Sequence, residues 1–412
     1  MKPAKVVLAA LLVLVIVTVP SLSACGEGES AQAHSVTLGF MSDFTGRAAF
    51  ALNQVYKGTQ DYLQMVEDED VIPDLEIELV TYDTRGDYGR APAGYQWLRG
   101  QGSQLIFMPS AQDQETLASR LEADQIPAIG GQGSQLLLDQ RWAFSLYPAT
   151  GALGRLLLEW IMNQWDYEGE GRLPRVAHAG YASYLTTADY KNWIDDYLEA
   201  NPDKFDWKGH HAPPMGTTTW SLESQKLRDC DYVIVSIVGP GTGSFIKEMR
   251  QRGYDGDFLS GIDAFPGFWD LIREVNTPDS LYGCSVIHFL PWWNDGGSFV
   301  QEAKDRLAKY RTEAEAGPLL RSSNYFSGSG MALLAVDAIR RAVDQVGVDN
   351  ISAEAIQDAL VNTNLVVEGW GNPWEFQDTN ACARTARMYD WDLQLEDWVG
   401  TGEWYDVPLR IE

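Results

Sequence analysis

The amino-acid sequence predicts an α/β protein built from two doubly wound lobes of similar size. Short apolar strands alternate with helices along most of the chain, which is the pattern of a parallel sheet covered by helices. The alternation runs from about residue 36 to residue 147 and then restarts, and no proline-rich linker separates the two runs. Two such lobes side by side would place the carboxyl ends of their strands around a shared crevice, where ligands bind in folds of this class.

The first run contains five expected strands and two helices with clear signals. The strands are 36–41, 75–80, 105–108, 128–129 and 144–147. Residues 105–108 (LIFM) are continuously apolar and lie between turn residues, which favours a strand buried on both faces. Val55, Thr59, Tyr62 and Val66 recur at helical spacing, and 114–124 is a second helix.

The second run repeats the pattern and ends in a different one. Its expected strands are 176–179, 232–238, 258–259 and 285–289. Its expected helices are 153–164, 190–198, 244–252, 299–315 and 325–346. Residues 388–399, rich in Trp and Asp, are expected to form a final strand pair.

The N-terminus has the three parts of an export signal. Lys2 and Lys5 precede an apolar run, Val6–Val19, which is too short to span a bilayer as a helix. Residues 22–25 (LSAC) resemble a bacterial lipobox, which would make Cys25 a lipidated first residue after a signal peptide of residues 1–24. Residues 25–35 would then be a tether above the membrane. The alternative is an ordinary signal with a chance cysteine.

Charge and cysteine content exclude several classes of function. The formal net charge of −27 opposes binding to nucleic acid or anionic lipid through simple electrostatics. Cys230, Cys284 and Cys382 are odd in number, so at least one thiol stays unpaired within the chain, and their pairing is left open. No Cys/His cluster has metal spacing, and the His210-His211 pair is expected to be a solvated turn, so no metal or cofactor is predicted.

Four short motifs, taken in order, resemble one family. They are 40–46 (FMSDFTG), 82–84 (YDT), 121–129 (LEADQIPAI) and 254–259 (YDGDFL). They resemble the opening strand and loop, the stretch after the second strand, a helix leading into a strand, and a glycine-containing return to a strand in type I periplasmic-binding-fold proteins. The likeness is to the branched-chain amino-acid-binding branch and covers about residues 36–398.

The resemblance implies an organisation with three crossings between the lobes. The first lobe would comprise residues 36–147 and 291–377, and the second would comprise residues 148–290 and 378–412. It also implies an extracytoplasmic binding protein that closes on a hinge around a small polar ligand, such as an amino acid or an amide. The partners would be the permease and ATPase subunits of an ABC importer, and the membrane through the lipid on Cys25.

Two loops of the first lobe follow strand ends that face the expected cleft. The first holds Ser110 and Gln112, where similar proteins use a Ser/Thr run to hold a ligand carboxylate at a helix N-terminus. This chain has a single hydroxyl there, and the nearby Asp113 would repel an anionic ligand. Ser110 could instead only cap the helix. The second loop holds Gly133 and Ser134, where similar proteins offer backbone groups and a hydroxyl; a loop without contact to ligand is the alternative.

The second lobe offers two further loops and aromatic candidates. Gly239 begins a glycine-rich turn that lacks the Gly-Lys-Ser/Thr of a phosphate loop, so it is a general helix N-terminal site or a plain turn. Asp263 lies where similar amino-acid binders carry an acid for the ligand ammonium, although it could cap the following segment. Tyr181 and Tyr184, together with Phe50 of the first lobe, are candidates for covering the ligand, with ordinary packing as the alternative for each. The Trp292-Trp293 pair is expected to pack at the hinge.

Two other functions remain open at this stage. The same fold could serve as a ligand sensor for a partner receptor. An enzyme of the glycosidase type would need a pair of carboxylates from distant positions. The sequence has no GxSxG or HExxH motif, so we expect a binding protein without catalytic residues.

Overall fold

The computed structural model describes residues 34–131, 133–262, 264–371, 373–376 and 379–411. These residues belong to one compact unit. The predicted signal peptide, Cys25 and Asp263 lie outside the described residues.

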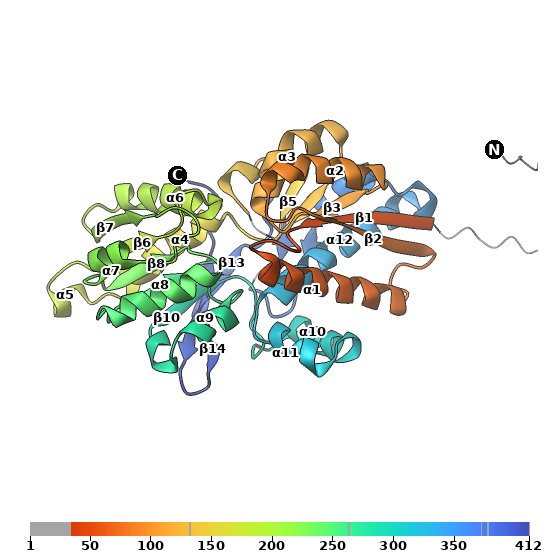
Figure 1. Cartoon of the computed structure of the whole chain (residues 1–412). Helices are drawn as coiled ribbons and strands as arrows, with labels where there is room; N and C mark the ends of the chain where they lie inside the picture. Colours follow the sequence, from red (N-terminus) through yellow and green to blue (C-terminus); the bar gives the residue numbers. More distant parts are fainter. Residues whose placement is uncertain (1–33, 132, 263, 372, 377–378, 412) are drawn as a thin grey trace, which may run out of the picture. The chain divides into compact units, whose positions relative to one another are not determined.

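The first lobe contains a parallel sheet of five strands in the order β2-β1-β3-β4-β5 (Figure 1). The strands are β1 (His34–Ser42), β2 (Leu75–Asp83), β3 (Leu105–Phe107), β4 (Ala128–Gly130) and β5 (Ala143–Ser145). Helices cover both faces of this sheet: α1 and α12 lie on one side, and α2 and α3 on the other. The helices of this lobe are α1 (Ala49–Asp68), α2 (Ala91–Gly100), α3 (Ala111–Asp124), α10 (Ser298–Tyr310), α11 (Glu313–Leu319), α12 (Asn324–Val346) and α13 (Ala353–Val361).

Strand β3 is buried on both faces of the sheet, which explains why its sequence has no polar side. Leu105 and Phe107 pack into the main core with the α1 and α12 side chains, whereas Ile106 packs into a separate cluster with α2 and α3. Successive side chains of a strand point to opposite faces, so a strand covered by helices on both faces must be apolar throughout. The prediction made from residues 105–108 is confirmed by this burial.

The second lobe contains seven strands in the order β14-β13-β10-β9-β8-β6-β7. The strands are β6 (Arg175–Ala179), β7 (Asp206–His211), β8 (Tyr232–Val235), β9 (Asp257–Ser260), β10 (Cys284–His288), β13 (Thr385–Asp392) and β14 (Asp397–Asp406). The first five are parallel, and the last two pair antiparallel at one edge. The helices are α4 (Thr150–Gln164), α5 (Tyr167–Glu170), α6 (Leu185–Ala200), α7 (Ser221–Leu227), α8 (Pro240–Gln251) and α9 (Trp269–Val275).

Short elements fill the connections. They are the two-stranded sheet of β11 (Asn364–Leu365) and β12 (Trp374–Glu375), and the 3-10 turns η1 (Tyr88–Arg90), η2 (Gln135–Leu137), η3 (Pro278–Leu281) and η4 (Val348–Asn350).

The chain passes between the lobes three times, after β5, after β10 and before β13. The passes touch one another: the Tyr147 and Phe289 rings lie 4.1 Å apart, and the Cys382 amide donates to the Ser145 carbonyl at 3.0 Å. The predicted fold class, two doubly wound α/β lobes, is therefore confirmed. The exact lobe boundaries at 147, 290 and 377 stay predictions.

Helices α1 and α12 approach each other unusually closely in the first lobe. A Cβ on Gly58 would lie 2.2 Å from the Tyr325 carbonyl oxygen, and one on Gly328 would lie 1.8 Å from the Val55 carbonyl oxygen. Both contacts are shorter than any real Cβ permits, so glycine is required at each position. The Thr59 hydroxyl also donates to the Gly328 carbonyl at 3.1 Å, which ties the two helices together.

Several elements differ from the sequence-based expectation. Helices α2, α7, α9 and α13 and strand β7 have no counterpart among the predicted elements. The predicted helix 299–315 is two helices, because Thr312 and Glu315 form a capping box that starts α11. The solvated turn expected at His210 and His211 is wrong: both residues end β7 and are half-buried.

The three cysteines of the described chain, Cys230, Cys284 and Cys382, are buried and unpaired. Burial raises the pKa of the Cys230 and Cys284 thiols to about 12. They therefore remain neutral thiols that fill the core.

Candidate functional site

A cavity of about 610 Å³ lies between the lobes and receives side chains from both. From the first lobe its walls include Asp43, Arg47, Leu52, Val55, Thr84, Tyr88, Ser110, Asp113, Gly131, Asn324 and Ser327. From the second lobe and the first crossing they include Tyr147, Tyr181, Tyr184, Met215, Thr217, Thr218, Val238, Gly239, Pro240, Gly241, Ile262, Ala264 and Phe268. Most of these residues follow the carboxyl ends of parallel strands, which is where ligands bind in such folds.

The loop between β1 and α1 is held at the cavity by two carboxylates. Asp43 accepts hydrogen bonds from the backbone N–H groups of Gly46 and Ala48, the latter at 2.9 Å. Asp83, at the end of β2, accepts from the Phe44 backbone N–H at 3.0 Å and from the Thr45 hydroxyl at 2.7 Å. Partial burial opposes ionisation of Asp83, but these bonds prevail and lower its pKa. The loop therefore has a fixed shape before any ligand arrives.

Helix α3 begins at the cavity wall. Ser110 occupies its N-cap position, yet its side chain makes no capping hydrogen bond. Asp113, in the first turn, is 2% exposed, and its Oδ1 has no hydrogen-bond partner. Burial, together with the nearby Asp43, raises the pKa of Asp113 to about 7.

The second lobe presents aromatic and backbone groups to the cavity. Tyr181 and Tyr184 follow β6, and Gly239 precedes α8 with a φ of 70°, a left-handed conformation that favours glycine. A Cβ on Gly241 would lie 1.9 Å from the Tyr181 hydroxyl oxygen, so the ring and the start of α8 are in close contact. This wall is neutral and holds no Asp, Glu, Lys or Arg among the described lining residues.

A buried polar chain supports this second wall. The Tyr181 backbone N–H donates to the Thr187 hydroxyl at 3.0 Å, and Ser236 lies 3.2 Å from that hydroxyl. Ser236 lies 2.8 Å from Nε2 of His178, whose Nδ1 is 2.9 Å from Nδ1 of His210. Burial, with His210 and His211 nearby, holds the pKa of His178 well below its ordinary value, so this ring is neutral and structural.

The predicted site residues fall into three groups. Ser110, Tyr184 and Gly239 line the cavity together, as does Tyr181. Gln112 and Phe50 are half-buried near it without lining it, and the Phe50 ring lies 6.3 Å from that of Phe268 across the lobes.

The remaining candidates lie elsewhere. Gly133 packs against the first crossing, and a Cβ added to it would lie 2.4 Å from the Pro148 carbonyl oxygen. The Ser134 hydroxyl donates a hydrogen bond to Glu115. Gly131 of the same loop lines the cavity instead. Asp263 lies outside the described residues. The Trp292 and Trp293 indoles are buried and bonded to Asp397 and Ser322, away from the cavity.

Sequence reasoning did not propose Tyr88, Phe268, Asn324 or the loop of Met215–Thr218, all of which line the cavity. Asn324 reaches it from the start of α12, and its side-chain N–H group donates to the Gly267 carbonyl at 2.8 Å across the lobes. No local sequence signal marks these residues, because only the packing of distant segments brings them to the cleft.

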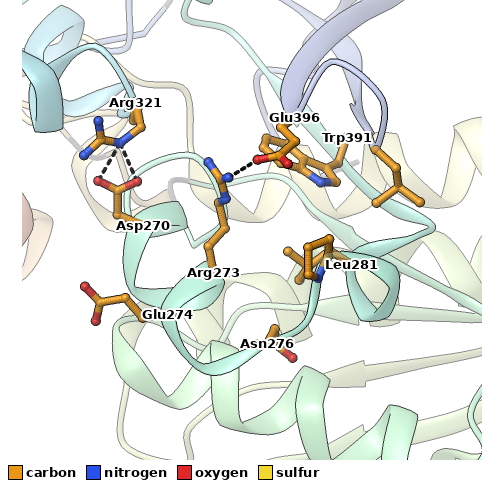
Figure 2. Close-up of a pocket in the computed structure, with 10 residues that line it drawn as sticks. Asp270, Arg273, Glu274, Asn276, Leu281, Arg321, Trp391 and Glu396 are labelled. Atoms are coloured by element: carbon orange, nitrogen blue, oxygen red, sulfur yellow. Dashed lines mark hydrogen bonds and ion pairs between the residues drawn. The ribbon is translucent and has the colours of Figure 1, made fainter.

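A second cavity, of about 390 Å³, lies beside α9 and the β13–β14 hairpin (Figure 2). Arg321 Nε pairs with Asp270 at 2.8 Å, and Arg273 pairs with Glu396. Because these four charged side chains pair with one another, they are less available to a ligand than the carboxyl group of Asp113 in the interlobe cavity. Arg321 precedes α12 of the first lobe and Asp270 lies on α9 of the second, so the first pair joins the two lobes.

Within the described part of the chain, no group of three or more His, Cys, Asp or Glu side chains is placed to hold a metal ion. No helix among the same residues is long and apolar enough to span a membrane.

The fold and the interlobe cavity together define a two-lobed binding protein. A family profile described as periplasmic binding protein matches residues 35–394, so the chain belongs to that family. The family and the structural neighbours consist of solute-binding proteins and not enzymes. The predicted likeness to type I periplasmic-binding-fold proteins is thus confirmed, as is the prediction that the chain is not an enzyme. Membership of this family also implies an extracytoplasmic location.

Solved structures show the same fold at low sequence identity. A branched-chain amino-acid ABC transporter protein from Thermus thermophilus with bound valine is 17% identical, with a TM-score of 0.77 over 91% of this chain and 97% of that one. A fatty acid ABC transporter substrate-binding protein from Thermomonospora curvata is 16% identical, with a TM-score of 0.75 over 93% and 95% of the two chains. A solute-binding protein from R. palustris in complex with 4-hydroxybenzoate is 15% identical, with a TM-score of 0.74 over 91% and 98%. A comparison with the sequences of curated proteins finds no match.

Proposed function

We propose that this protein is the extracytoplasmic solute-binding subunit of an ABC importer. It would capture a small polar ligand, such as an amino acid or an amide, by closing its lobes around the cavity between them. The observation that carries the proposal is this cavity, about 610 Å³ in size and lined from both lobes at strand ends. A ligand that contacts both walls stabilises the closed arrangement, because its affinity for that arrangement is higher than for an open one.

The structural neighbours support binding and leave the ligand open. By their descriptions they bind valine, belong to a fatty acid transporter, or bind 4-hydroxybenzoate, so the same fold accepts chemically different ligands. The ligand of this chain must therefore be inferred from its own cavity walls. The permease and ATPase subunits of an importer are the partners that the family descriptions favour.

The N-terminal motif LSAC extends the proposal to a lipid anchor on Cys25. Cells expressing the full chain should yield membrane-associated protein whose first residue is a diacylglyceryl cysteine, detected by mass spectrometry. The variant Cys25→Ser should leave the protein without lipid. An unprocessed N-terminus, or cleavage at another residue, would contradict the anchor and leave the binding function untouched.

Binding is tested by a thermal-shift screen followed by calorimetry. The screen should cover amino acids, primary amines, amides, fatty acids and aromatic acids. We expect at least one class to raise Tm, with a one-to-one complex in calorimetry. Replacing the cavity residue Tyr184 by Ala should weaken that complex about tenfold or more, since it removes an aromatic contact buried with the ligand. Tyr167→Ala, at a half-buried position on α5 away from the cavity, is the matched control and should bind normally. The absence of binding by every class would overturn the proposed function.

A further inference from the structure

The wall formed by the first lobe contains two buried carboxyl groups. Asp43 and Asp113 both line the cavity and are 4% and 2% exposed. Asp43 is satisfied by two backbone N–H groups, whereas Oδ1 of Asp113 has no donor. A buried carboxyl oxygen without a donor is costly, so such a group in a native fold needs an explanation.

No cation of the described chain compensates Asp113. Its carboxylate takes part in no ion pair among these residues, and the charged group that acts on it is another acid, Asp43. Arg47 is the only Lys or Arg among the described lining residues, but its side chain is exposed at the cavity and is not paired with Asp113. Because Asp113 lines the cavity, a molecule bound there can supply the partner that its carboxyl group lacks.

The walls and the volume of the cavity limit what such a partner can be. Leu52, Val55, Ile262 and Phe268 give the cavity apolar walls. Its volume of about 610 Å³ is that of a small-molecule site. An apolar body with a single polar head fits this arrangement. An acidic head near Asp113 would face two carboxyl groups, which is unfavourable.

We propose that Asp113 is the specificity-determining residue of the cleft and that it receives a protonated amine at the head of a ligand with an apolar body. This inference rests on the proposed function and names the ligand class of the same cavity. It agrees with the sequence-based expectation that Asp113 would repel an anionic ligand at the start of α3, where the family resemblance alone would place a ligand carboxylate. A carboxylate on the ligand, if present, would have to lie toward Arg47.

The proposal carries a pH dependence. Asp43, on the loop before α1, acts electrostatically on Asp113, and Asp113 in turn acts on Tyr88 of η1. Arg47 and Tyr184 line the same cavity. Burial raises the pKa of Asp113 to about 7, so near neutral pH a bound ammonium must displace a proton from part of the population. Affinity for an amine should therefore rise as pH increases from 6 to 8, by up to about tenfold per unit below the pKa.

The experiment uses the full mature chain and a matched set of probes of similar size. The aromatic set is phenethylamine, hydrocinnamamide and hydrocinnamate, and the aliphatic set is hexylamine, hexanamide and hexanoate. Calorimetry is run at pH 6, 7 and 8 on the wild-type protein, on Asp113→Asn and on Glu115→Gln. Glu115 lies on the same helix, bonded to Ser134 and away from the cavity, so its variant controls for general effects on α3.

We expect one or both amines to bind and the matching acids to bind at least tenfold more weakly. Asp113→Asn should weaken amine binding about 30- to 1,000-fold, since it removes a buried charged partner, and Glu115→Gln should leave it unchanged. The inference would be overturned if acids or amides bound more tightly than amines. It would also be overturned if Asp113→Asn left amine affinity unchanged. Either result would still be consistent with a binding function. If no amine binds, while another class in the thermal-shift screen does, the inference fails alone. If no class binds, the proposed function fails with it.

Discussion

Two regions of the first lobe each bury an aspartate, but only one of them provides it with a cation and hydrogen-bond donors. At the contact between α1 and α12, Asp61 is 3% exposed and pairs with Arg311 at 2.6 Å, while the Tyr325 hydroxyl donates to it at 3.0 Å. At the cleft, Asp113 is equally buried and lacks both a cation and a donor for Oδ1. The first region is complete without a ligand, and the second is not. The comparison distinguishes Asp61, whose carboxylate stabilises the fold, from Asp113, whose carboxylate is proposed to bind a ligand.

The largest effect should come from breaking the complete region. Asp61→Asn leaves Arg311 largely buried without its counter-charge, which should lower the free energy of unfolding by about 3–5 kcal/mol. Asp68→Asn removes a partner of Lys309 in a more exposed pair and should leave stability nearly unchanged. Urea unfolding of both variants is the measurement. Equal losses would mean that Asp61 is no more structural than a surface acid.

The contribution of Asp113 to stability should depend on pH. The pKa of Asp113 is about 7 in the folded chain, against about 3.9 when unfolded, so between these values the folded state binds more protons. Its contribution to stability is present at low pH and is lost as pH rises through 7, by at most about 4 kcal/mol. Without ligand, Asp113→Asn should therefore gain stability relative to wild type from pH 5 to pH 8. A difference that stays constant over this range contradicts the assigned environment.

The tight contact of α1 and α12 allows a smaller test of the same region. Gly58→Ala forces a Cβ against the Tyr325 carbonyl, and such overpacking costs about 1–3 kcal/mol. Gly100→Ala, at the end of α2, meets no atom within 4 Å and should be neutral or slightly stabilising. Thermal unfolding distinguishes them. If both substitutions are neutral, the close approach of the two helices is not a constraint.

The smallest effect is expected at the ion pair that joins the lobes. The Arg321 side chain is 50% exposed. Its pair with Asp270 should therefore contribute only about 0.2–1 kcal/mol to closure. Arg321→Ala should then weaken binding of a cleft ligand by up to about fivefold, whereas Arg340→Ala, whose pair lies within α12, should not. Calorimetry with the best probe measures both. A loss of tenfold or more would make this pair a main determinant of closure.

Much of the fold follows from the sequence because burial on both faces leaves a direct pattern. Residues 105–108 had to be apolar throughout, and the restart after residue 147 marked the second lobe. Ser110, Tyr184 and Gly239 could be proposed for a second reason. Parallel strands bring their carboxyl ends to one edge of the sheet, so the loops that follow them meet. These residues line one cavity, and their contact with a ligand stays a prediction.

The rest of the site depends on tertiary packing that no local pattern reports. Asn324 comes from a distant segment, and Tyr88 lies in a short 3-10 turn. Asp113 was visible in the sequence, but only as an acid that would repel an anion. The burial of Asp113 and the absence of a donor for its Oδ1 appear only in the folded structure. These two observations are the reason for proposing that Asp113 binds a cation and does not only repel an anion.

The most direct measurement of this interpretation is proton release on ligand binding. Phenethylamine stays protonated at pH 7, whereas Asp113 is close to half-protonated. Calorimetric titrations at pH 7 in buffers of different ionisation enthalpy give the number of protons exchanged. We predict the release of about half a proton per bound amine in the wild-type protein, and none in Asp113→Asn. No release in the wild type, or the same release in both proteins, would contradict the assignment of Asp113 as the amine receptor.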